Sequence, residues 1–289
     1  MRITDVILDF DGTCTQIPAI YQAFLAQYLE ELNKTVFAGS PVMKSEWQQV
    51  QTRVMAQSPD AGWTVANTPA APAAADPYIL AFECAAYLLR QKKLPPNIPA
   101  SVFANASALH PAPWRPEARR VLETLLQHNI GVTFISNSSS KTITQRLLEL
   151  FAVTTLPFGV GVKSSAEKYK ITEPVWDNDW SPEARQSFAQ LPAIYTNPGI
   201  ARPVYLRRAA YFEALNAALG NTADRLHTSL VCGDIWEMDL AMPYALGANI
   251  HLVTRARPFE TYAYERRAAL TNPLRGKISD DLTGLLQWL

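Results

Sequence analysis

The chain has 289 residues, of which 48% are hydrophobic, enough to form a core and too many for a disordered chain. Its 26 basic and 26 acidic residues cancel to a formal net charge of zero. Because no basic run longer than a pair of arginines stands out, the electrostatic signature of a nucleic-acid-binding protein is absent, and we expect no nucleic-acid partner.

The cysteines and the first residues of the chain indicate its compartment. Cys14, Cys84 and Cys232 form no close-spaced pair, which is typical of free thiols in a reducing environment. The N-terminal residues lead directly into a strand pattern and lack the features of a signal peptide. No apolar run approaches the roughly 20 residues that span a bilayer. We therefore expect a cytoplasmic protein that is not associated with a membrane.

Short apolar runs alternate with helical patterns along much of the chain. The first run is Val6-Ile7-Leu8, and similar runs begin at Gly131, Ser229 and Ile250. Strands that alternate with helices in this way predict βαβ units and a parallel sheet buried on both faces. The fold class that we predict is α/β, with a Rossmann-like three-layer α/β/α core. Residues 279–289 predict a closing amphipathic helix.

One long interval after the first strand does not follow this rhythm. Apolar residues at helical spacing predict helices over residues 20–32, 45–55 and 77–89. The alanine-rich and proline-rich residues 58–76 predict a loop or linker. We interpret the whole interval as a mostly helical cap domain. The predicted domains are residues 1–14 with 113–289 for the α/β core and residues 15–112 for the cap.

A second irregular interval covers residues 157–205. Residues 159–162 and 168–171 predict short strands within it, and the remainder predicts an ordered loop. Long loops in compact domains are often functional, so a role at the mouth of a site and a packed surface excursion are both open interpretations.

Two carboxylates lie where the first strand ends, in the run Asp9-Phe10-Asp11-Gly12-Thr13. Two ionised carboxylates at the end of a buried strand are costly without a partner, and a divalent cation removes that cost. Mg²⁺ prefers oxygen ligands and keeps waters and substrate phosphate in its shell. In a parallel sheet such a site belongs at the carboxyl ends of the strands. The run therefore indicates a phosphoryl-transfer loop.

Polar side chains also follow two other predicted strands. Ser136 and Asn137 end the strand from Gly131, ahead of a helix whose N-terminal amides suit a phosphate. Asp234 and Asp239 follow the strand from Ser229 and add carboxylates to the same crevice. A phosphoryl group also needs a cation beside the nucleophile as charge develops.

These motifs, in this order, resemble those of the haloacid-dehalogenase-like hydrolase superfamily, of the phosphatase type with a helical cap. The run DFDGT from Asp9 to Thr13 matches the first motif of the superfamily. FISNS, with Ser136, matches the second motif, and GDIWEMD, with Asp234 and Asp239, matches the fourth. The resemblance covers the core domain.

The resemblance implies a role for each matched residue. Asp9 is the nucleophile that forms an aspartyl-phosphate, and Asp11 is the acid that protonates the leaving oxygen and then activates water. Mg²⁺ is held by the Asp9 carboxylate, the Asp11 backbone carbonyl and Asp234, while Asp239 supports these ligands or binds through a water. The resemblance gives Ser136 the contact with the substrate phosphate, and we expect Asn137 and Arg208 to bind the phosphate with it.

The third motif is where the chain departs from the superfamily, which has a lysine at the start of the helix before the fourth-motif strand. Arg207 and Arg208 stand there instead. We favour Arg208, because large apolar residues then fall at +3, +4 and +7 on the buried face of the helix. Arginine binds phosphate in a bidentate way but is not equivalent to lysine. The alternatives to Arg208 are Arg207, Arg202 and Lys163.

The expected function is Mg²⁺-dependent hydrolysis of a small phosphomonoester. Asp11 favours phosphoryl chemistry over dehalogenation, because the dehalogenases typically lack this second aspartate and the metal. Phosphonate hydrolysis, phosphomutase activity and dehalogenation stay open as alternatives, and so does a non-catalytic protein that binds or regulates a partner. The partner that we expect is a small phosphorylated molecule, whose identity the sequence does not indicate, and the oligomeric state is equally open.

Overall fold

The computed structural model describes residues 2–176, 180–220 and 223–289. Two compact units make up the chain. The first, the core unit, comprises Met1–Thr15, Trp114–Arg255 and Thr261–Leu289. The second, the helical unit, comprises Gln16–Pro113 and Ala256–Glu260. Among the described residues, no helix combines the length and the apolar character that a membrane span requires.

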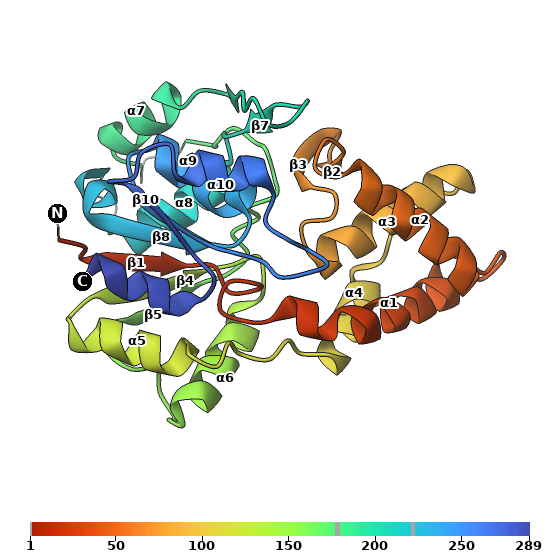
Figure 1. The fold of residues 1–289 in the computed structure, drawn as a ribbon, viewed down its shortest axis with the longest axis horizontal. Coiled ribbons are helices and arrows are strands. Elements are labelled where there is room, and N and C mark those ends of the chain that lie inside the picture. The colour runs from red at the N-terminus through yellow and green to blue at the C-terminus, as the bar shows by residue number, and fades with distance from the viewer. Residues whose placement is uncertain (1, 177–179, 221–222) are drawn as a thin grey trace. The chain divides into compact units, whose positions relative to one another are not determined.

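The core unit is built on a six-stranded parallel sheet in the order β10-β9-β8-β1-β4-β5 (Figure 1). The strands are β1 (Asp5–Leu8), β4 (Gly131–Ile135), β5 (Val160–Lys163), β8 (Ser229–Gly233), β9 (Asn249–Val253) and β10 (Gly276–Ser279). The predicted parallel sheet is confirmed. The strand that precedes Asp9 lies between β4 and β8, so the carboxyl ends of these three strands meet at one edge of the sheet.

Helices cover both faces of this sheet. Val6 and Leu8 of β1 point into one apolar cluster and Ile7 into another, because successive side chains of a strand face opposite ways. The cluster around Val6 and Leu8 includes residues of α5 (Ala118–Gln127), α6 (Ser140–Phe151) and η4 (Leu282–Trp288). The cluster around Ile7 includes residues of α7 (Pro182–Gln190), α8 (Ala209–Ala218), α9 (Ala241–Ala245) and α10 (Ala263–Ala269). The three-layer α/β/α arrangement is therefore confirmed.

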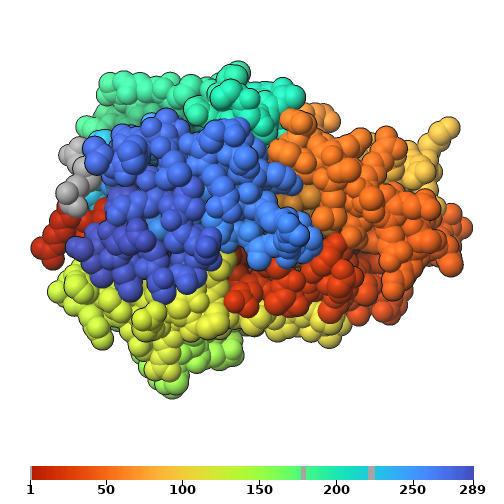
Figure 2. Space-filling view, viewed as in Figure 1, coloured from red at the N-terminus to blue at the C-terminus, as the bar shows by residue number. Residues whose placement is uncertain are grey.

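The helix predicted over residues 279–289 is present but shorter. Ser279 is the last residue of β10, and the helical turns of η4 begin only after Asp281. The Asp281 carboxylate accepts a hydrogen bond from the Thr283 N–H at 2.8 Å, which caps η4. The Leu282 N–H donates to the Glu117 carboxylate, and Figure 2 shows the dark blue C-terminal residues beside the yellow residues of the α5 region.

The irregular interval predicted over residues 157–205 is partly ordered into short elements. They include β5, α7, β6 (Ile194–Tyr195) and β7 (Val204–Tyr205), and α8 and η2 (Ala223–Thr228) follow the interval. The strand predicted over residues 159–162 is β5. The strand predicted over residues 168–171 is wrong, because this stretch turns and Thr172 makes only an isolated bridge to Arg208.

The helical unit contains the three predicted helices and elements that were not predicted. Its elements are η1 (Ile17–Ile20), α1 (Tyr21–Thr35), α2 (Lys44–Gln57), β2 (Gly62–Val65), β3 (Thr68–Pro72), α3 (Pro77–Gln91) and α4 (Ala100–Leu109). The expectation of a loop or linker over residues 58–76 is wrong for its centre. The strands β2 and β3 pair antiparallel there, and Ala73 and Ala74 are buried in the core of this unit. Small side chains let this stretch pack closely instead of linking elements.

A short segment from late in the chain also belongs to the helical unit. Phe259, from the segment Ala256–Glu260, is only 2% exposed and lies in the same apolar cluster as residues of α1 and α3. Its ring meets that of Tyr21 edge to face at 4.9 Å. Arg255 and Thr261 flank this segment on either side. The Arg255 N–H donates to Thr261 Oγ1 at 2.8 Å and so joins the two ends of the segment.

Candidate active site

The loop after β1 is shaped by Gly12 and Thr13. Gly12 has a φ of +86°, and a Cβ atom there would lie 2.5 Å from Oδ2 of Asp234. Only glycine therefore permits both the left-handed backbone and the close approach of Asp234. The Thr13 hydroxyl lies 3.0 Å from Oδ2 of Asp9 and 3.0 Å from Oδ1 of Asp234, so it bridges the two carboxylates.

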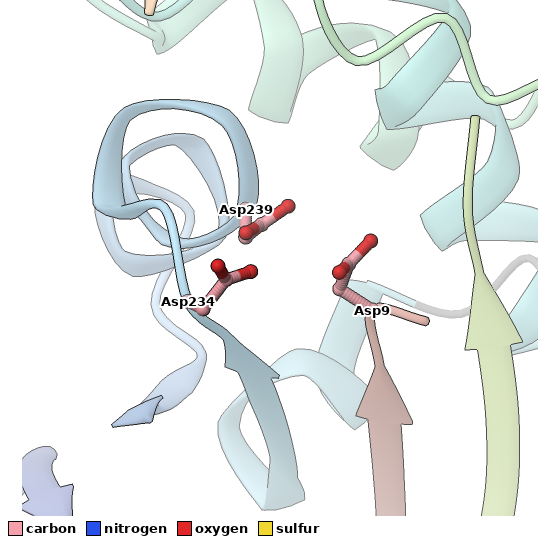
Figure 3. A group of neighbouring side chains, drawn as sticks. All are labelled: Asp9, Asp234 and Asp239. Carbon is pink, nitrogen blue, oxygen red and sulfur yellow. The ribbon is translucent and has the colours of Figure 1, made fainter. Parts of the chain in front are cut away.

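Three buried carboxylates converge at the carboxyl ends of β1 and β8 (Figure 3). Asp9, Asp234 and Asp239 each offer an oxygen, and these oxygens lie within 4.8 Å of one another. Asp239 lies on the helical turn η3 (Trp236–Leu240), and its approach requires Gly233, where a Cβ would lie 2.2 Å from the Cβ of Asp239. Hard oxygen donors grouped in this way fit Mg²⁺. Asp239, predicted as a supporting residue, thus offers an oxygen to the same group.

The cation at this site is Lys168, which sequence reasoning missed. Its Nζ lies 2.5 Å from Oδ1 of Asp9 and 2.7 Å from Oδ1 of Asp239, and its side chain is 1% exposed. Burial disfavours the charged ammonium, but the carboxylates of Asp239 and Asp9 outweigh this effect and raise the pKa of Lys168 above its ordinary value. Lys168 therefore carries its charge throughout the physiological pH range.

A signal for Lys168 was present in the sequence. The residue follows β5, a strand of the same parallel sheet, so it approaches the same edge as the residues after β1, β4 and β8. The interpretation of residues 168–171 as a strand hid it, because a lysine inside a strand would not reach that edge.

The structure corrects the choice of Arg208 as the cation beside Asp9. Arg208 is fully buried, and its Nε donates to the Tyr205 carbonyl at 3.1 Å while its Nη1 donates to the carbonyl of Lys168. Arg208 thus contacts the main chain of the residue whose ammonium contacts Asp9.

The three alternative cations lie elsewhere in the core unit. Arg207 pairs with Glu173 at 2.7 Å. Arg202 pairs with Glu237 at 2.7 Å. Lys163 is exposed at the end of β5.

Asp11 is hydrogen-bonded to the loop after β4. The Ser138 hydroxyl donates to Oδ2 of Asp11 at 2.5 Å, and the Ser138 N–H donates to Oγ of Ser136 at 3.1 Å. Burial raises the pKa of the Asp11 carboxyl above its ordinary value, although the hydrogen bond from Ser138 and the charge of Arg146 oppose the rise. The loop that contributes Ser136 therefore also holds the second carboxylate of the first motif.

Burial has the same effect on the Asp9 carboxyl. It raises the pKa of Asp9, and the adjacent ammonium of Lys168 opposes the rise. A second cation among the three carboxylates would favour ionised Asp9 further. The role of the Asp11 backbone carbonyl as a metal ligand stays a prediction.

Asn137 contacts the main chain of Lys168. Its Oδ1 accepts a hydrogen bond from the Lys168 N–H at 2.8 Å. Ser136 is buried at the end of β4, where its N–H donates to the Lys163 carbonyl at 3.2 Å. The sequence-predicted residues after β1, β4 and β8 are thus brought to one edge, whereas the phosphate contacts of Ser136 and Asn137 stay predictions.

Neither a family model nor a curated protein matches the chain. Solved structures resemble it at low identity. A predicted phosphoglycolate phosphatase from Haemophilus somnus is 13% identical, with a TM-score of 0.49 over 99% of this chain and 98% of that chain. A putative HAD-hydrolase from Bacillus subtilis, bound to magnesium, is 13% identical, with a TM-score of 0.46 over 94% of this chain and 100% of that chain.

A dehalogenase is also similar to the chain. The L-2-haloacid dehalogenase from Xanthobacter autotrophicus, with chloropropionic acid covalently bound, is 13% identical, with a TM-score of 0.44 over 99% of this chain and 97% of that chain. Any choice between these chemistries has to come from the residues of the site. The motifs of the chain, and the parallel sheet that brings them together, make it similar to the haloacid-dehalogenase-like hydrolases.

Proposed function

We propose that the protein is a Mg²⁺-dependent phosphatase that hydrolyses a small phosphomonoester through an aspartyl-phosphate. The observation that carries the proposal is the Asp11 carboxyl, which lies in the same loop as Asp9. It accepts a hydrogen bond from the Ser138 hydroxyl at 2.5 Å, and burial raises its pKa. A raised pKa favours the protonated carboxyl, which is the form that can protonate a leaving alkoxide. Release of a halide needs no such acid, so Asp11 supports phosphoryl transfer over dehalogenation.

The reaction would proceed in two displacements. In the first, an oxygen of Asp9 bonds to phosphorus, the bond to the leaving oxygen breaks, and Asp11 gives its proton to that oxygen. In the second, Asp11 accepts a proton from water as the water oxygen bonds to phosphorus and the bond to Asp9 breaks. Lys168 lies beside Asp9 throughout, where its ammonium can balance the charge that develops on the phosphoryl oxygens.

The carboxylates of Asp9, Asp234 and Asp239 would hold the Mg²⁺. Three buried carboxylates lie together here, whereas Lys168 supplies a single positive charge to two of them. When bound, the ion would offset their negative charge and that of the substrate phosphate. Thr13 keeps the carboxylates of Asp9 and Asp234 oriented toward the same point.

Hydrolysis of p-nitrophenyl phosphate, measured with Mg²⁺ and with a chelator, tests the proposal. We expect turnover with Mg²⁺, loss of turnover with the chelator, and no turnover for Asp9→Asn. Asp5→Asn is the matched control, because Asp5 lies at the opposite end of β1 and pairs with Arg225. Turnover by Asp9→Asn, or release of chloride from 2-chloropropionate by the wild-type protein, would contradict the proposal.

Asp11→Asn tests the acid directly. We expect the first-turnover rate for an alkyl phosphate to fall by about 10²–10⁴-fold, the usual contribution of a positioned general acid. The rate for p-nitrophenyl phosphate should fall much less, because nitrophenolate leaves readily without a proton. Single-turnover release of each alcohol measures the difference. Equal losses for the two substrates would exclude Asp11 as the proton donor.

A further inference from the structure

Lys168 lies in an irregular stretch, residues 164–170, which we name the lysine loop. The loop follows β5 and leaves the sheet. Ser165 has a φ of 54° and Glu167 a φ of 43°, so both residues that flank Ala166 adopt a left-handed backbone. This conformation is unfavourable for residues other than glycine and persists only where the surroundings impose it. The shape of the lysine loop must therefore be held from outside.

Side chains from two distant elements hold the main chain of Lys168. Oδ1 of Asn137, just after β4, accepts the Lys168 N–H at 2.8 Å. Nη1 of Arg208, the residue before α8, donates to the Lys168 carbonyl. Both polar groups of the Lys168 peptide backbone are thus bound by side chains. The Ala166 N–H also donates to the Ser136 carbonyl at 3.1 Å, which ties the loop to the end of β4.

Arg208 is suited to this contact by its burial and by its forked head group. Its Nε binds the Tyr205 carbonyl at 3.1 Å, so one guanidinium joins β7 to the lysine loop. Burial lowers the pKa of Arg208 to about 10, which leaves it charged at neutral pH. Hydrogen bonds from a charged donor are stronger than those from a neutral one.

We propose that Arg208 and Asn137 are positioning residues that clamp the backbone of Lys168, so that its ammonium reaches Asp9 and Asp239. The ammonium sits at 2.5 Å and 2.7 Å from those carboxylates, and these short contacts depend on where the backbone places the side chain. The structural part of this proposal stands without any assumed activity. Its kinetic consequence rests on the proposed function.

Hydrogen–deuterium exchange of the whole protein tests the clamp independently of activity. In Arg208→Met, we expect peptides that cover residues 164–172 to exchange faster than in the wild type, while peptides from the middle of α8 exchange unchanged. Asn137→Ala should accelerate the same peptides. Arg207→Met is the matched control, because its side chain pairs with Glu173 and donates to the Leu191 carbonyl, and it should leave the exchange of the lysine loop, residues 164–170, unchanged.

Unaltered exchange of residues 164–172 in Arg208→Met would overturn the clamp. If Arg208→Met does not fold, Arg208→Lys serves in its place, because it keeps the charge but cannot reach both carbonyls with a fork. Arg208→Lys should then accelerate exchange of the lysine loop to a lesser degree, and exchange equal to that of the wild type would overturn the clamp in the same way.

A double-mutant cycle tests how Arg208 acts on turnover. We expect Arg208→Met to lower kcat by about 10²-fold, the loss that a misplacement of about 1 Å can cause. In a Lys168→Met background, the same change should cause no further loss, because the residue through which Arg208 acts is gone. Equal losses in the two backgrounds would overturn the proposal. A wild-type protein without turnover would refute the proposed function and leave the exchange experiment to decide the clamp.

Discussion

Gly12 sets how closely the first-motif loop can approach Asp234. Its φ is +86°, and a Cβ atom at this position would lie 2.5 Å from Oδ2 of Asp234. The position therefore accepts a hydrogen atom but not a side chain. Because Thr13 bridges Asp9 and Asp234 directly after this turn, any shift of Gly12 also shifts the two carboxylates relative to each other. The geometry of the proposed metal site thus depends on one missing methyl group.

Gly12→Ala should therefore weaken both the fold and the site. The left-handed backbone alone costs about 1–2 kcal/mol for a residue with a Cβ, and the clash with Asp234 adds to it. We expect a lower free energy of unfolding in urea and a weaker response of the proposed phosphatase activity to Mg²⁺. Gly39→Ala is the control, because a Cβ there meets nothing within 4 Å. If the two variants unfold at the same urea concentration, the account of Gly12 is incorrect.

At this scale, the residues that the sequence places well are those that directly follow an apolar strand. Asp9 and Asp234 are positioned by β1 and β8, whose pattern is visible in the sequence. Lys168 is positioned by left-handed residues at 165 and 167, by the hydrogen bond that its N–H donates to Asn137, and by the hydrogen bond that its carbonyl accepts from Arg208. None of these features produces a periodic pattern in the sequence. Arg208 was predicted to contact the substrate phosphate, whereas its guanidinium contacts the carbonyls of Tyr205 and Lys168.

His251 of β9 is fully buried and makes hydrogen bonds to residues of β10 and η4. Trp288 Nε1 donates to its Nδ1 at 3.1 Å, so Nδ1 must be the unprotonated nitrogen and Nε2 carries the hydrogen. Nε2 lies 2.7 Å from Oγ of Ser279. Burial, and to a lesser degree the charge of Lys277, lowers the pKa of His251 to about 4. The neutral ring thus joins β9 to β10 and to η4.

This histidine predicts a loss of stability in mild acid. Between pH 6.5 and pH 4, the unfolded chain binds a proton at His251 that the folded chain does not, so stability falls as the pH falls through this window. The expected loss is about 2 kcal/mol from pH 7.5 to pH 5, measured by urea unfolding. His251→Gln cannot titrate and should show a smaller loss over the same range. An identical loss in the two proteins would contradict the assignment of a neutral His251.

Elements with a strong apolar period were predictable, and weakly patterned ones were not. The sequence predicted β1, β4, β8 and α3 closely, because each buries a clear apolar face. The strand β10 was missed, because most of its residues are only half-buried. The β2–β3 pair was missed, because alanine and proline are uncommon in strands, and only burial in the helical unit makes a strand favourable there.

At the scale of the whole molecule, the helical unit draws on two separate parts of the sequence. The sequence argument gave residues 15–112 to one domain. The helical unit spans Gln16–Pro113 and also includes Ala256–Glu260. The second segment shows no repeating pattern of apolar residues, because its burial depends on a single aromatic ring, that of Phe259.

Phe259→Ala should destabilise the helical unit. Truncation of a buried phenylalanine costs about 3–5 kcal/mol through lost burial and the cavity that remains. We expect faster hydrogen exchange in α1 and α3, which line the same cluster, and a lower melting temperature. Phe158→Ala is the matched control, because Phe158 is fully exposed and its loss should change stability by less than about 0.5 kcal/mol. Unchanged exchange in α1 and α3 would show that Phe259 does not support this unit.

The central position of β1 has a consequence for the order of folding. Asp5 of this strand pairs with Gly131 of β4 and with Ser229 of β8. The ribosome releases β1 before the other strands of the sheet. Its neighbour β8 emerges only when most of the chain has been made, and pairings between such distant strands form slowly. The edge of β1 that faces β8 must therefore stay unpaired until β8 has been made. The first-motif loop that follows β1, with the proposed nucleophile Asp9, would be among the final features of a nascent molecule to take shape.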